Sequence, residues 1–156
     1  MVGSGKLWFV VVDEAVFIGE FEYRIDEKGR APIPPKFRRE LKEGVVLTPG
    51  AEKCIIAYPL AEWEKLAATL TSAALTPSKL RRLKRATFAT AFNLNIDGQG
   101  RIALPVSLRE HAGIGDEVVI AGANTYLELW NKEGWETEKK TSQEQAWQII
   151  ESMEQR

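Results

Sequence analysis

The sequence predicts a mainly β protein with short helices, an α+β chain, built from two tandem copies of one unit. The first observation is a repeated phrase: IDEKGRAPIPPKFRR over residues 25–39 returns as IDGQGRIALPVSLRE over residues 96–110, with the same spacing at every matching position. The second is that apolar and polar residues alternate just before each phrase, which is the pattern of a half-buried strand. Together they indicate a duplicated unit of about 48 residues.

Each copy begins with this alternating strand. The strand leads into D-x-x-G-R, where Asp at the first and Gly at the fourth position favour a type I turn. A second short alternating run follows, so each phrase predicts a hairpin with D-x-x-G-R at its tip. After Pro34 and Pro105, apolar residues spaced i, i+4 predict a short helix, and a further pair of strands closes each unit.

Helices are expected between the copies and after them. Apolar residues on one face mark an amphipathic helix after the first unit: Leu60, Trp63, Leu66 and Leu70. Thr76 and Pro77 suit the N-cap and N1 positions of the next helix, which carries KLRRLKR over residues 79–85. In the tail, Ser142 and Gln145 suit a capping box. The helix after them carries an apolar stripe that we expect in the core or at a subunit contact: Trp147, Ile150 and Met153.

Five segments follow from these boundaries. They are an N-terminal extension (1–16), the first unit (17–63), linker helices (64–87), the second unit (88–135) and a C-terminal helix (136–156). We interpret the extension as a segment that need not belong to the native protein; the alternative is that its apolar run LWFVVV adds an edge strand. Because each unit is near the lower size limit for independent stability, we expect the two to intertwine and the chain to form an oligomer.

The composition excludes several kinds of site. The chain has one cysteine, Cys54, in an apolar run, and one histidine, His111, at a helix end, so an internal disulfide, a multi-cysteine zinc site and a histidine cluster cannot form. There is no phosphate-binding glycine loop and no nucleophile elbow, so we expect no catalysis, no cofactor and no small-molecule substrate. LWFVVV is too short to span a membrane and lacks a signal cleavage site, which predicts a cytoplasmic protein without a membrane partner.

Arg30 and Arg101 end the two D-x-x-G-R motifs, next to the turns and on the same strand face as Asp26 and Asp97. A guanidinium in that place can bond phosphates or guanine edges in a two-pronged manner, while the aspartate holds it in one rotamer. The alternative is that each aspartate and arginine only tie their own turn together. Because a pair of arginine-tipped hairpins suits a symmetric partner, the repetition favours double-stranded DNA.

Charge is spread unevenly, although the formal net charge is only −1. Residues 24–42, which include Arg24 and Lys28, carry seven basic and three acidic side chains, whereas residues 86–156 carry six basic and eleven acidic ones. The first copy is therefore the better candidate for binding an anion, and a patch this modest needs several subunits to bind DNA tightly. The linker run adds candidate phosphate contacts, although a solvated helix face explains it equally well: Arg81, Arg82, Lys84 and Arg85.

The duplicated pattern resembles the AbrB-like swapped-hairpin fold, and three segments together resemble the MraZ family: FIGEFEYRIDEKGRAPIPPKFR, LTPGAEKCIIAYPLAEW and NIDGQGRIALPVSLREHAGI. The resemblance covers about residues 17–135. It implies a pseudo-twofold double-split β-barrel in which both motifs form DNA-contact hairpins, with the turns supported by Asp26, Gly29, Asp97 and Gly100. Lys28 fits the family pattern, whereas Gln99 departs from it in the second copy, so we expect Arg30 to contribute most.

For function, the resemblance implies a sequence-specific, DNA-binding transcriptional regulator that represses the bacterial division and cell-wall gene cluster. Such a protein is nucleoid-associated and forms a homo-oligomeric ring on short direct repeats in its own promoter. A second hypothesis is an AbrB-type antitoxin that binds a toxin protein and its own operator; two copies and a helical tail fit it less well. A third is a purely structural ring with no role in nucleic-acid binding.

Overall fold

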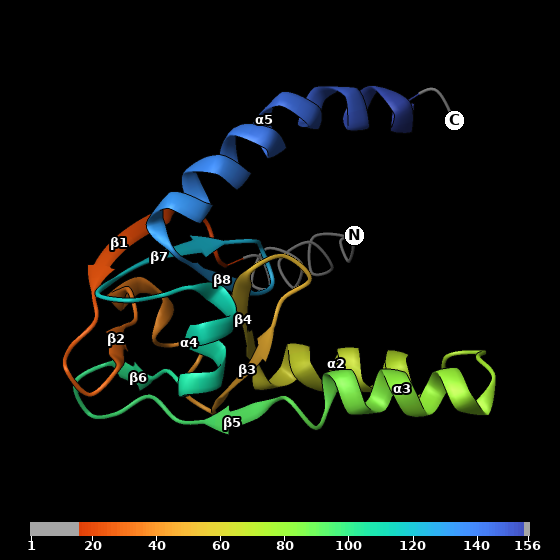
Figure 1. Ribbon diagram of the computed structural model, residues 1–156, viewed down its shortest axis with the longest axis horizontal. Helices are drawn as coiled ribbons and strands as arrows, with labels where there is room; N and C mark the ends of the chain where they lie inside the picture. The colour runs from red at the N-terminus through yellow and green to blue at the C-terminus, as the bar shows by residue number, and fades with distance from the viewer. Residues whose placement is uncertain (1–15, 155–156) are drawn as a thin grey trace, which may run out of the picture.

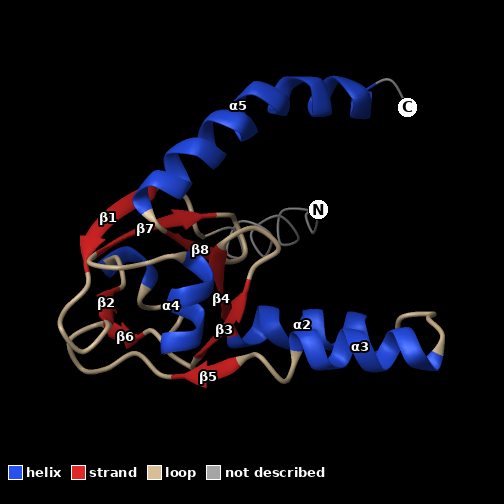
Figure 2. Cartoon of the chain, viewed as in Figure 1, coloured by secondary structure: helices blue, strands red, loops and turns tan. Residues whose placement is uncertain are grey.

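The computed structural model describes residues 16–154, and the expected N-terminal extension, with its alternative edge strand, lies almost entirely outside the described residues. Figures 1 and 2 show a β-rich body from which helices project. The strands are β1 (Glu20–Arg24), β2 (Arg30–Pro32), β3 (Val45–Pro49), β4 (Cys54–Pro59), β5 (Phe92–Leu94), β6 (Arg101–Ala103), β7 (Glu117–Gly122) and β8 (Leu127–Trp130). The helices are a 3-10 turn η1 (Pro35–Phe37), α2 (Leu60–Thr71), α3 (Pro77–Thr87), α4 (Val106–Ala112) and α5 (Lys132–Glu154).

A six-stranded antiparallel sheet, in the order β1-β7-β8-β4-β3-β5, interlocks the two units. β1 of the first unit pairs with β7 of the second, with Tyr23 opposite Val118, and β5 of the second pairs with β3 of the first, with Leu94 opposite Val45. β4 and β8 join the halves in the middle. The predicted hairpins are therefore wrong, because the strands that flank each D-x-x-G-R pair with the other unit rather than with each other.

The lengths of β2 and β6 give a physical reason for this exchange. Each has three residues, too few to bury an apolar face alone. They pair with each other in a separate two-stranded sheet, where Ala31 lies opposite Ile102 and both side chains enter one core. Among the described strands no closed barrel forms, because β1 and β5 lie at opposite edges of the sheet and do not pair with each other. The fold is mainly β with helices, in two tandem units, and the double-split barrel is not confirmed.

One hydrophobic core serves both units. Equivalent positions of the repeat enter it in pairs, Ile33 with Leu104 and Phe37 with Leu108, and none of these side chains is more than 3% exposed. Burying a side chain of this size contributes roughly 1.5–3 kcal/mol. Each copy therefore depends on the other for the burial of its apolar face.

The helical segments after the prolines differ between the copies. In the second unit, α4 buries Leu108 and Ala112, as the i, i+4 spacing predicted. In the first unit the predicted helix is wrong: only η1 forms, and successive i→i+3 turns follow it. Phe37 and Leu41 are still buried, and Phe37 stands at the position of the repeat that Leu108 takes in the second unit.

α2 and α3 form a helical hairpin that projects from one end of the β body (Figure 1). Thr76 caps α3 as predicted, and its side chain accepts a hydrogen bond from the Lys79 N–H. Trp63 of α2 packs against the rings of Tyr58 and Phe88. Neither helix has a fully buried residue, so aromatic contacts rather than a deep core hold the hairpin to the body.

α5 starts earlier than the helix predicted over residues 136–156. Asn131 acts as its N-cap, since Oδ1 accepts a hydrogen bond from the Gly134 N–H at 2.9 Å. The capping box is therefore wrong: Ser142 lies inside the helix, and its hydroxyl donates to a carboxylate oxygen of Glu138 at 3.0 Å.

The far half of α5 extends beyond the β body (Figure 1). Its apolar stripe is largely exposed, with Trp147 at 70%, Ile150 at 42% and Met153 at 66%. The stripe therefore does not lie in the core of the chain, so that expectation is wrong, and its alternative role as a subunit contact stays a prediction.

Candidate nucleic-acid interface

Two D-x-x-G-R loops lie side by side at one end of the molecule. The pairing of β2 with β6 brings them together: the Ile33 N–H donates to the carbonyl oxygen of Gly100 (2.8 Å), and the Leu104 N–H donates to that of Gly29 (2.9 Å). These reciprocal bonds relate the loops by a pseudo-twofold axis. We name them by their residues: loop one, 26–30, and loop two, 97–101.

In loop one, Asp26 closes the turn with both carboxylate oxygens. Oδ1 accepts from the backbone N–H groups of Lys28 and Arg30, each at 2.9 Å, and Oδ2 accepts from Nε of Arg30 at 2.7 Å. These donors, the Arg30 N–H foremost, hold the pKa of the Asp26 carboxyl below its ordinary value. The charged carboxylate therefore fixes the direction in which Arg30 leaves the turn.

Loop two repeats this arrangement. Oδ1 of Asp97 accepts from the N–H groups of Gln99 and Arg101, and Oδ2 accepts from Nε of Arg101, all at 2.9 Å. The pKa of the Asp97 carboxyl is lowered in the same way, chiefly by the Arg101 N–H. These bonds alone are equally consistent with the alternative that each aspartate and arginine only tie their own turn together. What goes beyond turn closure is the placement of the two loops next to each other.

Two independent constraints require glycine at the end of each turn. Gly29 has a φ of 75° and Gly100 a φ of 79°, in the left-handed region that side chains with a Cβ disfavour. The second constraint comes from the other unit: a Cβ at Gly29 would lie 3.0 Å from Cζ of Arg109, and a Cβ at Gly100 would overlap Cζ of Arg38.

Arg38 and Arg109 contact the loops, although the sequence analysis assigned them no role. Nε of Arg38 donates to the Ile33 carbonyl oxygen at 3.0 Å, and Nε of Arg109 donates to that of Leu104 at 3.1 Å. Each guanidinium then lies against the glycine of the other unit's loop, so the two arginines brace the loops across the pseudo-twofold axis. Both occupy matching positions of the repeated phrase, which is the signal that could have found them.

One contact breaks the symmetry of the loops. Nη1 of Arg101 lies 3.7 Å from Oδ2 of Asp26, in addition to the bond of its own Nε to Asp97. Arg30, within the part of the chain that the structure describes, forms an ion pair with Asp26 alone. The Arg30 side chain is also slightly more exposed, at 30% against 26%. Arg30 therefore keeps more donors available for an external partner.

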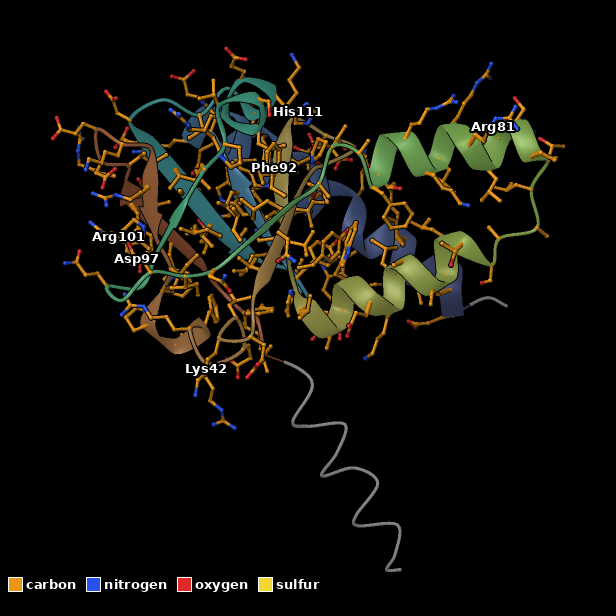
Figure 3. All side chains as sticks on the ribbon, turned by 90° about the horizontal axis from the view of Figure 1, so that it is seen from below. Lys42, Arg81, Phe92, Asp97, Arg101 and His111 are labelled. Carbon is orange, nitrogen blue, oxygen red and sulfur yellow. The ribbon has the colours of Figure 1, made fainter. Side chains whose placement is uncertain are left out.

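The remaining cations of the predicted site are divided between the two ends of the molecule. Lys28 is exposed on loop one, and Arg24 is exposed at the end of β1. Figure 3 shows Asp97 and Arg101 at the loop end and Arg81 at the opposite end, on α3. One chain therefore does not bring the loops and α3 together. The phosphate contacts proposed for four cations of α3 stay a prediction: Arg81, Arg82, Lys84 and Arg85. For these cations and the loops to contact the same DNA, another subunit or a long duplex is needed.

The surroundings of Cys54 and His111 are those of residues that support the fold rather than of reactive groups. Burial raises the pKa of the Cys54 thiol to about 12, which disfavours the reactive thiolate. Nε2 of His111 lies 3.2 Å from the carbonyl oxygens of Gly50 and Glu52. Among the described residues, no group of three or more His, Cys, Asp or Glu side chains could hold a metal ion.

No helix within residues 16–154 is both long enough and apolar enough to cross a membrane. Two interlocked units with paired arginine-bearing loops define a class of duplicated, strand-exchanged β proteins. The chain matches one protein family twice, over residues 16–86 and 87–156, and that family is described as "MraZ protein, putative antitoxin-like". The chain belongs to this MraZ family, and the two matches correspond to the two copies of its repeat.

Similar proteins from several bacteria carry the name "Transcriptional regulator MraZ". One from Dehalococcoides mccartyi (strain BAV1) is 60% identical over 141 residues, which cover 90% of this chain and 99% of the relative. One from Roseiflexus castenholzii is 43% identical over 121 residues, covering 78% and 85%. One from Acetivibrio thermocellus is 41% identical over 138 residues, covering 88% and 96%.

Proposed function

We propose that this chain is a sequence-specific DNA-binding regulator of transcription whose paired loops contact a duplex. The observation that carries the proposal is that Arg30 and Arg101, each held at Nε by an aspartate, lie close together at an exposed edge. With Nε occupied, the terminal Nη groups remain as donors, and such a fork matches O6 and N7 of guanine in the major groove. Because the aspartates pre-order both guanidinium groups, binding costs less side-chain entropy.

The names of the relatives support a role in transcription. In the finer form of the proposal, the chain represses the bacterial division and cell-wall gene cluster by binding short direct repeats in its own promoter, and acts in the cytoplasm at the nucleoid. Arg24 and Lys28 contact the DNA backbone beside loop one in this scheme, because both are exposed cations near Arg30.

Assembly into a ring is the second part of the proposal. With a net charge of −1, a single chain has a weak electrostatic hold on DNA, whereas a ring places several loop pairs along successive repeats. The exposed stripe of Trp147, Ile150 and Met153 on α5 supplies the apolar surface that a subunit contact requires.

Binding of the promoter region upstream of the protein's own gene tests the first part. Arg30→Ala is expected to weaken binding to that DNA by about 1–3 kcal/mol and to reduce its preference over random duplex. Arg101→Ala should cost less, because Arg101 shares its donors with two carboxylates. Arg30→Lys keeps the charge but loses the fork, so it should retain non-specific binding only. An unchanged preference for the promoter in Arg30→Ala would overturn the proposal.

The mass of the assembly in solution tests the second part. Ile150→Glu should dissociate the oligomer, since it places a charge in the stripe, while Gln148→Glu adds the same charge to an exposed position of the same helix and should leave the mass unchanged. Light scattering measures both. If Ile150→Glu retained the mass of the wild type, the stripe would not be the subunit contact.

A further inference from the structure

The exchange of segments between the units creates a pocket at the loop end. It has a volume of about 370 Å³ and lies between loop two and the turns that follow η1 in the first unit. Figure 3 shows Lys42, from those turns, at the same end of the molecule as Asp97 and Arg101. The residues that matter for its chemistry are Arg38, Arg39, Lys42, Asp97, Gly98 and Gly100.

Three cations from the first unit line the pocket. Arg38 is anchored through Nε on the Ile33 carbonyl oxygen, but Arg39 and Lys42 are exposed, and neither side chain forms an ion pair with a described residue. The carboxylate of Asp97 is the acidic group of the lining, and it already accepts bonds from loop two and from Arg101. Arg39 and Lys42 therefore have no ion-pair partner among the described residues, although they lie beside the carboxylate of Asp97, which is already bonded within loop two.

The opposite wall is an open glycine turn. No atom lies within 4 Å of the place where a Cβ of Gly98 would stand, so a ligand can approach the backbone of loop two closely. In loop one the matching position is Glu27, which would repel an anion.

The residues at the matching positions of the repeat have the opposite net charge. There, Arg109 replaces Arg38, but Glu110 replaces Arg39 and Gly113 replaces Lys42, beside Asp26 and Glu27. The strand exchange thus brings the cations of the first unit to loop two, which has no charged side chain between its aspartate and its second glycine. From the sequence alone, the basic residues of the first copy are expected beside loop one. In the structure, Arg39 and Lys42 lie beside loop two instead.

We propose that Arg39, Lys42 and loop two form a phosphate-binding site. Two exposed cations beside an open turn suit a phosphate group, whose oxygens accept several donors at once. We assign the ligand as a phosphodiester of the DNA backbone, which rests on the proposed function. Inorganic phosphate has the same chemistry and is the alternative source of the group. A phosphate held here anchors the duplex beside Arg101, as Arg24 and Lys28 anchor it beside loop one, so that the arginines of both loops are positioned to reach the bases.

Salt-titrated binding of the full-length chain to promoter and random duplexes tests the site. The double variant Arg39→Gln/Lys42→Gln should weaken binding to both duplexes equally and lower the salt dependence by about two contacts. The wild type should then lose about tenfold more affinity than the variant between roughly 50 and 200 mM salt. A control that removes the same charge from exposed positions outside the pocket, Lys53→Gln/Lys140→Gln, should retain the salt dependence of the wild type.

Titration calorimetry with inorganic phosphate separates the two sources of the group. If the double variant loses affinity for duplex, the site takes a backbone phosphate, and if it loses only the binding of inorganic phosphate, the site takes the free ion. Glu110→Arg, which adds a cation to the equivalent position, should strengthen duplex binding. Unchanged binding of both duplex and phosphate in the double variant would overturn the site. A wild type with no preference for its promoter would overturn the proposed function only, because random duplex and phosphate still test the pocket.

Discussion

Loop one and loop two have the same turn geometry but differ in the charged side chains that they carry. The positions that fix the turn are the same in both: an aspartate bonded to backbone N–H groups, a glycine with positive φ and an arginine bonded through Nε. The two positions between them differ, with Glu27 and Lys28 in loop one and Gly98 and Gln99 in loop two. The repeated residues bond inward, to their own turn or to the other unit, whereas the unrepeated ones face outward.

Because the turn-fixing positions repeat and the outward ones do not, the framework and the proposed binding surface are encoded by different positions. The framework depends on contacts that the duplication supplies twice, such as Arg38 on Gly100 and Arg109 on Gly29. The binding surface depends on side chains that can change without moving the backbone. Substitutions of the framework aspartates and glycines should therefore alter stability, substitutions in the outward positions should alter affinity alone, and substitutions of Arg30 and Arg101, which belong to both, should alter both.

The largest effect is expected where both units share one strand pair. Ile102 is buried at 1% exposure opposite Ala31, and Ile102→Ala should destabilise the protein by about 2–5 kcal/mol because it leaves a cavity in the common core. Urea unfolding followed by circular dichroism and tryptophan fluorescence measures this loss. The exposed neighbour gives the control, since Ala103→Ser should stay within about 0.5 kcal/mol. Two separate transitions in the wild type would contradict a shared core.

The glycines come next, and they separate the two loops. Gly29→Ala and Gly100→Ala should each cost about 1–3 kcal/mol from the left-handed backbone. Gly100→Ala should cost more, because its Cβ also overlaps the Arg38 guanidinium, and adding Arg38→Ala should recover part of the loss. Thermal unfolding compares them with Gly98→Ala, which meets no atom within 4 Å and should be neutral. Equal costs at Gly29 and Gly100, with no recovery when Arg38→Ala is added to Gly100→Ala, would refute the bracing role of Arg38.

The sequence could predict the loops because their determinants are local. Asp at the first and Gly at the fourth position of each motif specify the turn, and the alternation before it specifies a half-buried strand. The partner of that strand could not be predicted, since period two reveals which face is buried but not which strand lies alongside. The same limit hid Arg38, whose glycine partner belongs to the other copy.

Helix ends show the same division between local and distant information. The Thr76 cap of α3 was predictable because the bond to Lys79 spans a single turn. At α5 the predicted capping box at Ser142 was wrong, because the helix begins earlier, at the cap of Asn131, whose amide also donates to the Gly113 carbonyl oxygen of the second unit. That second contact is a tertiary one, which the local pattern around Ser142 did not reveal.

The aspartates should give a smaller effect that depends on pH. Because the folded pKa of the Asp26 carboxyl lies below its ordinary value of 3.8, its stabilisation is present above that value and is lost as the pH falls through the lowered pKa. Asp26→Asn should therefore lower stability at neutral pH and flatten the loss of stability between about pH 5 and pH 2. Asp97→Asn should do the same to a lesser extent, because Asp26 also faces Arg101. Thermal midpoints across that range measure both, and identical profiles for wild type and Asp26→Asn would contradict the assignment.

The smallest effect is expected at the outward position where the loops differ most simply, Lys28 against Gln99. Both side chains are exposed, so exchanging them should leave the free energy of unfolding unchanged. If each loop approaches the DNA backbone, Lys28→Gln should reduce the slope of log affinity against log salt by about 0.9, and Gln99→Lys should increase it by the same amount. Salt-titrated binding to a random duplex measures both slopes, with the double exchange as the control that restores the original charge. A change with Lys28→Gln but none with Gln99→Lys would mean that the cations of the first unit already neutralise the phosphate nearest loop two.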